Sequence, residues 1–470
     1  MPCDASDRWR VAFIAAAARL AVVVFAWDRF PPAADGVYYH ELARRIAEGH
    51  GYTWLWPDGV VTAAAHYPVG YPALVAPLYA LFGSRPLVAM LLNAALGALA
   101  APAVHALLTH TRSRRIACLG ALVVALHPAL IAYTPALMTE GITAALLACA
   151  AALAASSRAS RARSPRGRMP WLVAAACGLV LGLATLVRPQ CLALAPLYGL
   201  AALPRRTRVV SALGTSALVT AMTLGVCAPW TLRNCRAMGE CALVSVNGGW
   251  NLLIGTNADG RGAWAPLVVP PECKHVFDEA QKDRCFARAA RSRIADAPTA
   301  WLSLVPAKLG VTFDYCGAAG WYLETSNASA FGERSKLVLG AIETIVSRAL
   351  LGLALIGCLP SPRASWRRAR VALTRSVVFA GIAAAFSPYG AVAFAALCVA
   401  LVASRATKSA LASTSLAALV VTALTHATFF GAGRYQLVVL PFVAALAVRG
   451  AVRLGRLPRL APPRAATIAP

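Results

Sequence analysis

The stretch that decides the fold covers residues 27–72, WDRFPPAADGVYYHELARRIAEGHGYTWLWPDGVVTAAAHYPVGYP, and directly follows the first hydrophobic segment. Within it, Tyr38, Leu42 and Ile46 share one face at helical spacing, which predicts an amphipathic helix lying along a membrane surface. The stretch also holds five of only 19 acidic residues in the chain: Asp28, Asp35, Glu41, Glu48 and Asp58. We therefore interpret it as a polar loop that leaves the membrane after the first helix.

The composition indicates a membrane protein that crosses the bilayer many times. Of the 470 residues, 59% are hydrophobic and 14% are charged, with a mean hydropathy of +0.62. Soluble domains carry roughly 25% charged residues. The net charge of +26 would suit a nucleic-acid partner. The basic residues, however, form short clusters between apolar runs, as the positive-inside rule expects. We expect no nucleic-acid partner.

Twelve apolar segments have about the length that a transmembrane helix needs, some 20 residues. We expect an all-α polytopic protein with about 11–13 transmembrane helices in one membrane domain over residues 1–470. Residues 70–83 are too short to span and are interpreted as an interfacial or broken helix. The candidate spans are 11–27, 86–108, 116–133, 136–155, 171–187, 190–203, 209–228, 337–358, 372–388, 389–403, 410–428 and 435–449.

Charge sidedness predicts the orientation. With the N-terminus inside, more than half of the 45 basic residues fall in short inside loops, whereas Asp4 and Asp7 are the only acids there. Cytoplasmic loops carry such an excess of Lys and Arg. Both termini are therefore expected in the cytoplasm, with 450–470 as a basic tail near the inner lipid surface. Loops 28–69 and 229–336 are expected on the external face.

The second long loop is soluble in character and contains two pairs of nearby cysteines, Cys235 with Cys241 and Cys273 with Cys285. On an oxidising external face these pairs can form disulfides. Reduced thiols without a role are the alternative, and the sequence leaves both open. No pair of the 13 cysteines shows zinc-ligand spacing with histidines.

Two acids are candidates for chemistry. Asp35 begins the amphipathic helix, where a simple N-cap role is the alternative. Glu140 lies in the first turns of a spanning helix, where the helix dipole alone would favour it. Acids in spanning helices often mark functional sites, and the predicted topology places both carboxylates on the same face of the membrane.

Several basic and amide side chains stand at the same predicted face. Arg188 and Arg434 lie at helix ends, where each could be a phosphate ligand or a snorkelling interfacial arginine. Arg233 and Asn234 follow the seventh helix. Asn251 belongs to VNGGWNLLIGTN and could contact a sugar or satisfy the backbone of a turn.

Together these stretches resemble the GT-C superfamily of polytopic glycosyltransferases. The likeness is to family 39-like enzymes, the bacterial relatives of the protein O-mannosyltransferases and of the lipid A aminoarabinose transferase. The matching pieces keep the family's order, although region 258–430 matches only in hydropathy. They are D-G-x-Y-Y-x-x-L-A at 35–43, G-x-G-Y at 49–52, Y-P-V-G-Y-P at 67–72, T-E at 139–140, R-P at 188–189, A-P-W-T-L-R-N at 228–234, G-G-W-N-L-x-x-G-T-N at 248–257 and R-Y at 434–435.

The resemblance implies an enzyme of the bacterial inner membrane with its active site facing the periplasm. Such enzymes transfer a sugar from a polyprenyl-phosphate donor, usually with inversion, to a glycan, lipid or protein acceptor. Asp35 resembles the catalytic base, and Glu140 the second acid at the reaction centre. Arg188 and Arg434 are expected to hold the donor phosphate. Further substrate-binding candidates are Asp28, Tyr38, Tyr39, His66, Tyr67, Arg233, Asn234, Asn251 and Tyr435.

No metal or other cofactor is expected to be obligatory. Many soluble glycosyltransferases use a metal to hold a nucleotide diphosphate, and a lipid monophosphate donor lessens that need. Arginines can stabilise the charge that grows on the leaving phosphate.

Two rival functions are weighed against this one. A transporter or flippase of lipid-linked sugars would place charged sites near the bilayer midplane, often between inverted repeats, and the sequence shows neither. An O-antigen-ligase-like GT-C enzyme would carry its decisive basic residues in a late external loop and would lack the acid after the first helix.

Overall fold

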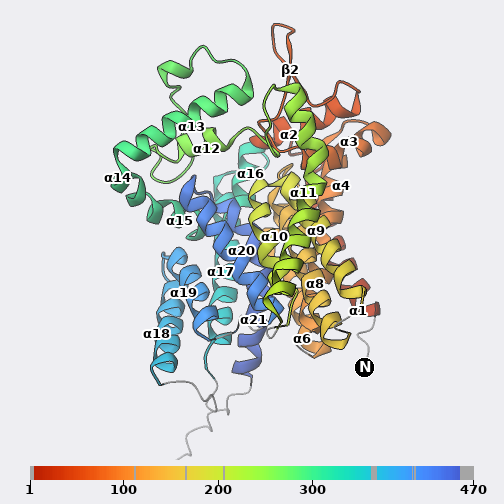
Figure 1. The fold of residues 1–470 in the computed structure, drawn as a ribbon, viewed down its shortest axis with the longest axis vertical. Coiled ribbons are helices and arrows are strands. Elements are labelled where there is room, and N and C mark those ends of the chain that lie inside the picture. Colours follow the sequence, from red (N-terminus) through yellow and green to blue (C-terminus); the bar gives the residue numbers. More distant parts are fainter. Residues whose placement is uncertain are drawn as a thin grey trace, which may run out of the picture.

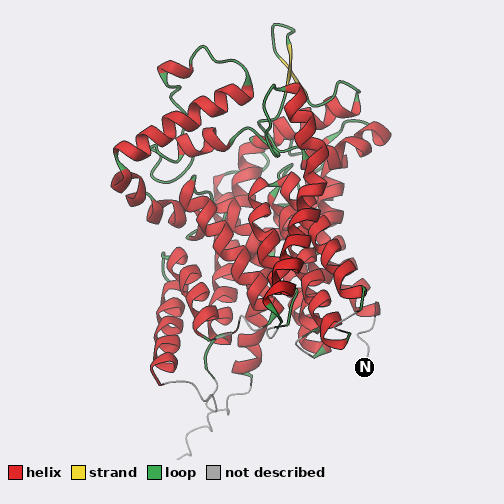
Figure 2. Ribbon diagram, in the orientation of Figure 1, coloured by secondary structure: helices red, strands yellow, loops and turns green. Residues whose placement is uncertain are grey.

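The computed structural model describes residues 5–110, 113–164, 167–204, 207–360, 368–404, 406 and 409–455. These residues form a bundle of helices with one small two-stranded sheet (Figures 1 and 2). Eight helical segments of the described chain are long and apolar enough to cross a membrane. This confirms the predicted all-α polytopic fold. The spanning segments contain α1 (Ala5–Ala26), α4 (Pro86–Ala98) with α5 (Ala100–Thr109), α8 (Glu140–Arg163), α9 (Met169–Val187), α11 (Val209–Ala237), α17 (Glu333–Gly357), α20 (Ala410–Thr428), and η4 (Gly433–Val439) with α21 (Leu440–Leu454).

The four remaining predicted spans form shorter or more charged helices. Segment 116–133 is divided into α6 (Arg114–Ala125) and α7 (Pro128–Ala132), because the residue before a proline is driven out of the helical region. Segment 190–203 begins as the 3-10 turn η1 (Pro189–Ala193) and continues as the short α10 (Leu194–Ala201). Segments 372–388 and 389–403 correspond to α18 (Arg368–Ala385) and α19 (Gly390–Ala403).

Both long loops lie at one end of the molecule, which we call the loop end (Figure 1). The first loop holds α2 (Asp35–Ala47) and an antiparallel hairpin of β1 (Thr53–Leu55) and β2 (Val61–Ala63), and is followed by α3 (Gly70–Phe82). The second holds α12 (Gly248–Ile254), η2 (Pro271–Cys273), α13 (Glu279–Asp296), α14 (Pro298–Ser303), α15 (Val305–Phe313) and α16 (Ala318–Ser326).

A half-buried carboxylate helps to join the two loops. Glu279, the first residue of α13, accepts hydrogen bonds from the backbone N–H groups of Ala65 (2.7 Å) and His66 (2.9 Å). The indole N–H of Trp54 donates to it as well. Burial raises the pKa of Glu279, while these donors oppose the shift. The contact fixes the second loop against the segment that leads into α3.

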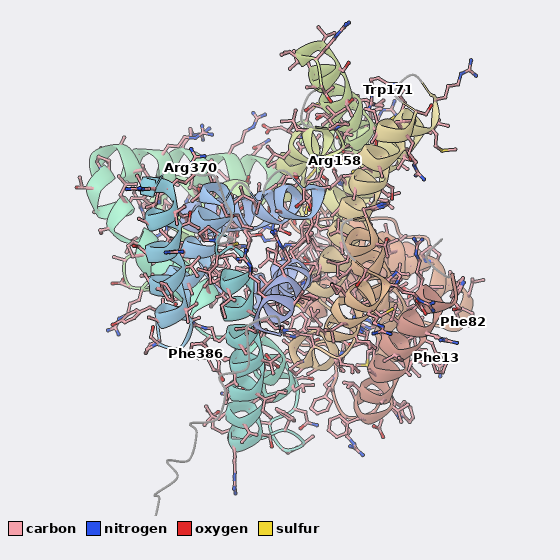
Figure 3. All side chains as sticks on the ribbon, turned by 90° about the horizontal axis from the view of Figure 1, so that it is seen from below. Phe13, Phe82, Arg158, Trp171, Arg370 and Phe386 are labelled. Carbon is pink, nitrogen blue, oxygen red and sulfur yellow. A yellow bond between two sulfur atoms is a disulfide. The ribbon has the colours of Figure 1, made fainter. Side chains whose placement is uncertain are left out.

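Large apolar side chains project from the outer surface of the bundle. Phe13, Phe82 and Phe386 are 74%, 61% and 73% exposed, and Figure 3 shows them at the periphery. A surface of this kind suits a lipid solvent, because a contiguous apolar exterior is unfavourable in water. The side of the membrane to which each end belongs stays a prediction. Of the predicted tail 450–470, residues 456–470 lie outside the described part.

One glycine decides how closely the first loop packs on the bundle. A Cβ at Gly70, where α3 begins, would come within 2.5 Å of the backbone of Leu186 and Val187 at the end of α9. We expect Gly70→Ala to lower stability by about 1–3 kcal/mol, because backbone atoms cannot yield as a flexible side chain can. Thermal unfolding in detergent measures this.

Gly225→Ala in α11 is the matched control, since nothing lies within 4 Å of a Cβ there. A midpoint of Gly70→Ala equal to that of Gly225→Ala would contradict the close approach.

Candidate active site

Four charged side chains from distant parts of the chain form one line of ion pairs at the loop end. Arg434 Nη2 lies 2.8 Å from Asp35 Oδ2, and Arg434 Nε lies 3.5 Å from Glu140 Oε1. Arg188 Nη1 lies 2.8 Å from the same Glu140 oxygen. The predicted topology placed these residues on one face, and the structure brings them into direct contact.

The helix ends explain why these charges are tolerated. Asp35 and Glu140 are the first residues of α2 and α8, where the positive end of the helix dipole favours an anion. Arg188 directly follows the last residue of α9, where the negative end favours a cation. Three of the four charges therefore complement the helix that carries them.

The N-cap interpretation of Asp35 is wrong. Ala34 occupies the cap position with φ of 50°, and no side chain caps the helix. The Asp35 carboxylate instead accepts two hydrogen bonds. Arg434 Nη2 donates to Oδ2, and the Tyr67 hydroxyl donates to Oδ1 at 3.4 Å. A positive φ at a non-glycine residue is strained and persists only where the surroundings hold it.

The hydroxyl of Tyr322 from α16 supplies that support. Its oxygen accepts the backbone N–H of Ala33 and that of Leu137, each at 3.2 Å. Ala33 leads into Asp35 and Leu137 leads into Glu140. One buried phenol therefore sets the position of the two acidic segments relative to each other. Sequence reasoning missed Tyr322, because a single tyrosine in a long loop carries no pattern.

The two carboxylates have different surroundings. The Glu140 side chain is 2% exposed, and both of its oxygens are occupied: Tyr133 donates to Oε2 at 3.2 Å, while the arginines contact Oε1. The Asp35 side chain is 35% exposed. Asp35 is thus the carboxylate that a substrate can reach, and Glu140 is enclosed by its cations.

The aromatic ring of Tyr435 contacts both arginines. The guanidinium carbons of Arg188 and Arg434 lie 5.0 Å and 5.2 Å from its ring centre, which are cation–π distances. On this ring, His426 stacks at 3.9 Å with an interplanar angle of 9°. The sequence analysis singled out Tyr435 but not His426.

Aromatic residues of the first loop surround Tyr67 beside Asp35. Tyr38 stacks on Tyr67 with centroids 5.0 Å apart, while Tyr39 and His66 meet it edge to face. Burial raises the pKa of Tyr67, with a further contribution from Asp35, so the phenol stays a hydrogen-bond donor. Burial lowers the pKa of His66 to about 4, so the imidazole is neutral at physiological pH.

Four other predicted binding residues lie outside the line of ion pairs. Arg233 donates to the carbonyls of Ala64 (2.7 Å) and Tyr52 (2.6 Å), which fits a structural role in holding the first loop. Asn234 is buried and donates to the carbonyl of Ala242. Asp28 is exposed beside Arg29. The Asn251 side chain makes no hydrogen bond within the described chain. Substrate binding by these residues stays a prediction.

The two cysteine pairs are joined in the structure. The sulfur atoms of Cys235 and Cys241 are bonded, as are those of Cys273 and Cys285. The second bridge lies in a small buried cluster with Leu253 and Phe286 and links η2 to α13. It thereby stiffens the second loop, which packs on the first through Glu279.

Comparisons with known proteins give distant matches. No family model and no curated protein matches the sequence. Among solved structures, the archaeal oligosaccharyltransferase AglB from Archaeoglobus fulgidus, in complex with an inhibitory peptide and a dolichol-phosphate, is 13% identical with a TM-score of 0.49. The match covers 96% of this chain but only 50% of that one, so the chain spans about half the length of the archaeal enzyme.

ArnT from Cupriavidus metallidurans also matches. Its apo structure is 17% identical with a TM-score of 0.39, and the match covers 96% of this chain and 78% of that one. The structure bound to undecaprenyl phosphate gives a TM-score of 0.37 at 17% identity, with 94% and 77% covered. Because the likeness is distant, we derive the function from the site alone.

The burial of Glu140 generates a stability prediction. Glu140→Gln removes the charge that neutralises Arg188 and Arg434, whose side chains are only 11% and 17% exposed. Removing one partner of a buried ion pair typically lowers the free energy of unfolding by about 3–5 kcal/mol. We expect a clear fall in the thermal unfolding midpoint. Asp28→Asn, at an exposed acid, serves as control, and equal midpoints for the two variants would refute the proposed charge balance.

Proposed function

We propose that the protein is a GT-C-like glycosyltransferase that moves a sugar from a polyprenyl-phosphate donor to an acceptor hydroxyl. The observation that carries this proposal is the contact between Arg434 and the partly exposed Asp35 carboxylate, with Arg188 bound to Glu140 behind it. In this arrangement a candidate proton acceptor contacts one cation, Arg434, and a second cation, Arg188, lies on the other side of Glu140's oxygen in the same line of ion pairs.

Asp35 takes the role of general base. An acceptor hydroxyl must lose its proton as it attacks the anomeric carbon, and a positioned carboxylate can accept it. Arg434 Nη2 donates to Oδ2 of this carboxylate at 2.8 Å and holds it in place. Tyr67 donates to the other carboxylate oxygen and helps to orient it.

Arg434 and Arg188 are assigned to the donor phosphate. Arginine forms forked, charge-assisted hydrogen bonds with phosphate oxygens. Arg434 Nε is buried without a hydrogen-bond partner among the described residues, so the guanidinium has unused donor capacity. A phosphate that binds Arg434 would share this cation with Asp35.

Glu140 acts as a positioning residue in this proposal rather than as a second reacting group. Its oxygens are already occupied by Arg188, Arg434 and Tyr133, and it is almost fully buried. Its charge holds the two arginines at a fixed separation. Preorganised cations of this kind stabilise a developing negative charge without rearranging during the reaction.

The reaction is then a single displacement. The acceptor oxygen forms a bond to the anomeric carbon while its proton passes to Asp35. The bond from that carbon to the phosphate oxygen breaks, and the polyprenyl phosphate leaves with the electron pair. Attack from the face opposite the leaving group inverts the anomeric configuration. The leaving phosphate is a stable anion, so no general acid is required.

The position of the site favours this function over transport. Asp35, Glu140 and Arg188 lie at helix ends next to the loop end, where a lipid headgroup meets water. A transporter would be expected to place such charges near the midplane. We further propose that the loop end faces the periplasm of a bacterial inner membrane, since the positive-inside rule assigns the basic loops to the cytoplasm. Glycan, lipid and protein acceptors remain open.

The base assignment predicts a loss of catalytic rate. We expect Asp35→Asn to lower the rate of transfer by about 10²- to 10⁴-fold, the usual contribution of a general base. The assay follows release of polyprenyl phosphate from a panel of polyprenyl-phosphate hexoses and pentoses in proteoliposomes supplied with membrane glycolipids and proteins. Asp58→Asn, at an exposed acid of the same loop, is the matched control. Wild-type turnover by a folded Asp35→Asn protein would rule out this role.

The phosphate assignment predicts a loss of affinity. We expect Arg434→Gln and Arg188→Gln each to weaken binding of polyprenyl phosphate by about 10- to 100-fold, since a hydrogen bond to a charged group contributes about 1.5–3 kcal/mol. Calorimetric titration in detergent measures this directly. Arg85→Gln, at an exposed arginine of the same end, should bind normally. Unchanged affinity in both site variants would remove the arginines from the donor site.

A further inference from the structure

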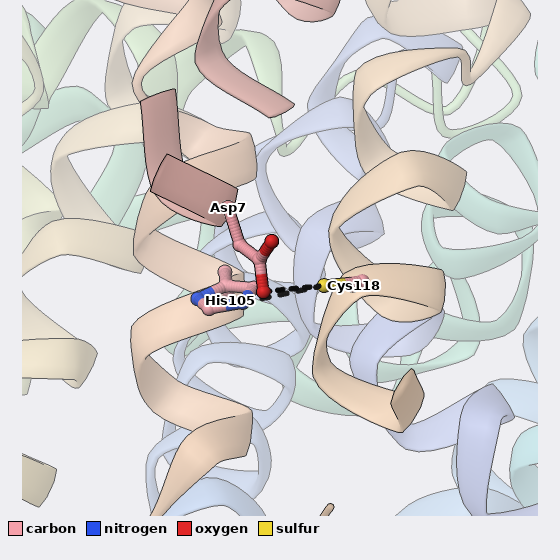
Figure 4. A group of neighbouring side chains, drawn as sticks. All are labelled: Asp7, His105 and Cys118. Carbon is pink, nitrogen blue, oxygen red and sulfur yellow. Dashed lines mark hydrogen bonds between the residues drawn. The ribbon is translucent and has the colours of Figure 1, made fainter. Parts of the chain in front are cut away.

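A second cluster of ligand-type side chains lies at the end opposite the candidate active site. Asp7 in the first turns of α1, His105 in α5 and Cys118 in α6 point toward one another (Figure 4). These three helices pack together, and the N-terminal part of α1 lies far from the loop end (Figure 1). The three residues are separated by up to 111 positions, so the sequence showed no metal-ligand spacing.

The geometry matches that of a tetrahedral metal site. Cys118 Sγ lies 3.5 Å from Asp7 Oδ2 and 3.6 Å from His105 Nε2. The three ligand atoms all lie within 4.8 Å of one another. With metal–ligand bonds of about 2.0–2.3 Å, neighbouring ligands of tetrahedral zinc lie roughly 3.3–3.8 Å apart. Two of the three distances between the ligand atoms already have this length.

The donor set and its charge suit a borderline-soft divalent cation. A thiolate, an imidazole and a carboxylate are the three ligand types that zinc takes in proteins. One thiolate and one carboxylate balance the two charges of a divalent ion, and the remaining positive charge belongs to Arg114, whose side chain is 55% exposed. This balance matters because His105 and Asp7 are buried, with 0% and 6% exposure, and an uncompensated charge there would be costly.

Arg114 is compatible with this arrangement. It donates to both oxygens of Asp7, through Nη2 to Oδ1 at 2.8 Å and through Nε to Oδ2. Only the contact with Oδ2 must be given up, because Oδ2 is the atom that faces Cys118. The Arg114 side chain is 55% exposed. Its remaining bond to Oδ1 would orient the ligating carboxylate, as outer-shell partners commonly do.

We propose that Asp7, His105 and Cys118 form a zinc-type metal site that joins α1, α5 and α6. When the ion binds, the Cys118 thiol loses its proton to solvent and the sulfur bonds to the metal. Lone pairs of His105 Nε2 and Asp7 Oδ2 complete three positions, and water takes the fourth. The His105 Nδ1 atom has no hydrogen-bond partner among the described residues, so no contact there forces the proton onto Nε2. This site is independent of the proposed glycosyl transfer.

Cobalt is the probe for this site, because a thiolate–Co²⁺ bond gives a charge-transfer absorption band. The full-length protein in detergent is stripped with a chelator, titrated with Co²⁺ and then with Zn²⁺. We expect a saturable band that Zn²⁺ abolishes. Cys118→Ser should lose the band, whereas Cys398→Ser in α19, another half-buried cysteine, should keep it. No band in the wild type, or an unchanged band in Cys118→Ser, would overturn the proposal.

A second measurement uses the unaltered protein and does not depend on how variants fold. Zn²⁺ should slow maleimide labelling of Cys118, measured by peptide mass mapping, by at least about tenfold. The half-buried Cys149 and Cys398 serve as internal references and should label at the same rate with and without the ion. Equal labelling of Cys118 in both conditions would exclude metal binding through its sulfur.

Discussion

The candidate site depends on the position of Arg434, which contacts both acidic residues at once. Asp35 begins α2 in the first loop and Glu140 begins a spanning helix, and the Arg434 guanidinium lies between their carboxylates. Arg188 adds a second cation to Glu140. Two anions and two cations thus balance, which is the condition for holding them in a poorly solvated place. In the proposed reaction, the donor phosphate adds negative charge to this group and binds its two cations.

The second loop acts on this site without contributing a charge to it. Tyr322 holds the backbone segments before Asp35 and before Glu140 through one hydroxyl oxygen. Glu279 binds the backbone just before Tyr67, whose own hydroxyl reaches Asp35. The disulfide between Cys273 and Cys285 stiffens the same loop. Residues 229–336 therefore help to fix the position of the first loop, although the sequence alone suggested only a soluble loop.

The sequence predicted the parts of the structure that follow from periodicity and charge. Hydropathy located all eight full-length spans, and charge sidedness placed the two long loops together. The four central charges could be selected because acids and arginines beside spanning helices are rare. The shorter helices were predicted less well, because a proline or a cluster of arginines limits a helix in ways that hydropathy alone does not reveal. Tyr322, His426 and the Asp7 cluster were missed, since each acts through contacts between segments far apart in the chain.

The order of the elements along the chain has a consequence for biosynthesis. Asp35, Glu140 and Arg188 are all made before residue 190, whereas Arg434 belongs to the last spanning segment. During synthesis the ribosome must complete nearly the whole polypeptide before the fourth charge arrives. Until then Asp35 lacks its ionic partner, and Glu140 has Arg188 alone. A chain truncated before its final helix would insert most of its spans and still lack the complete group of four charges.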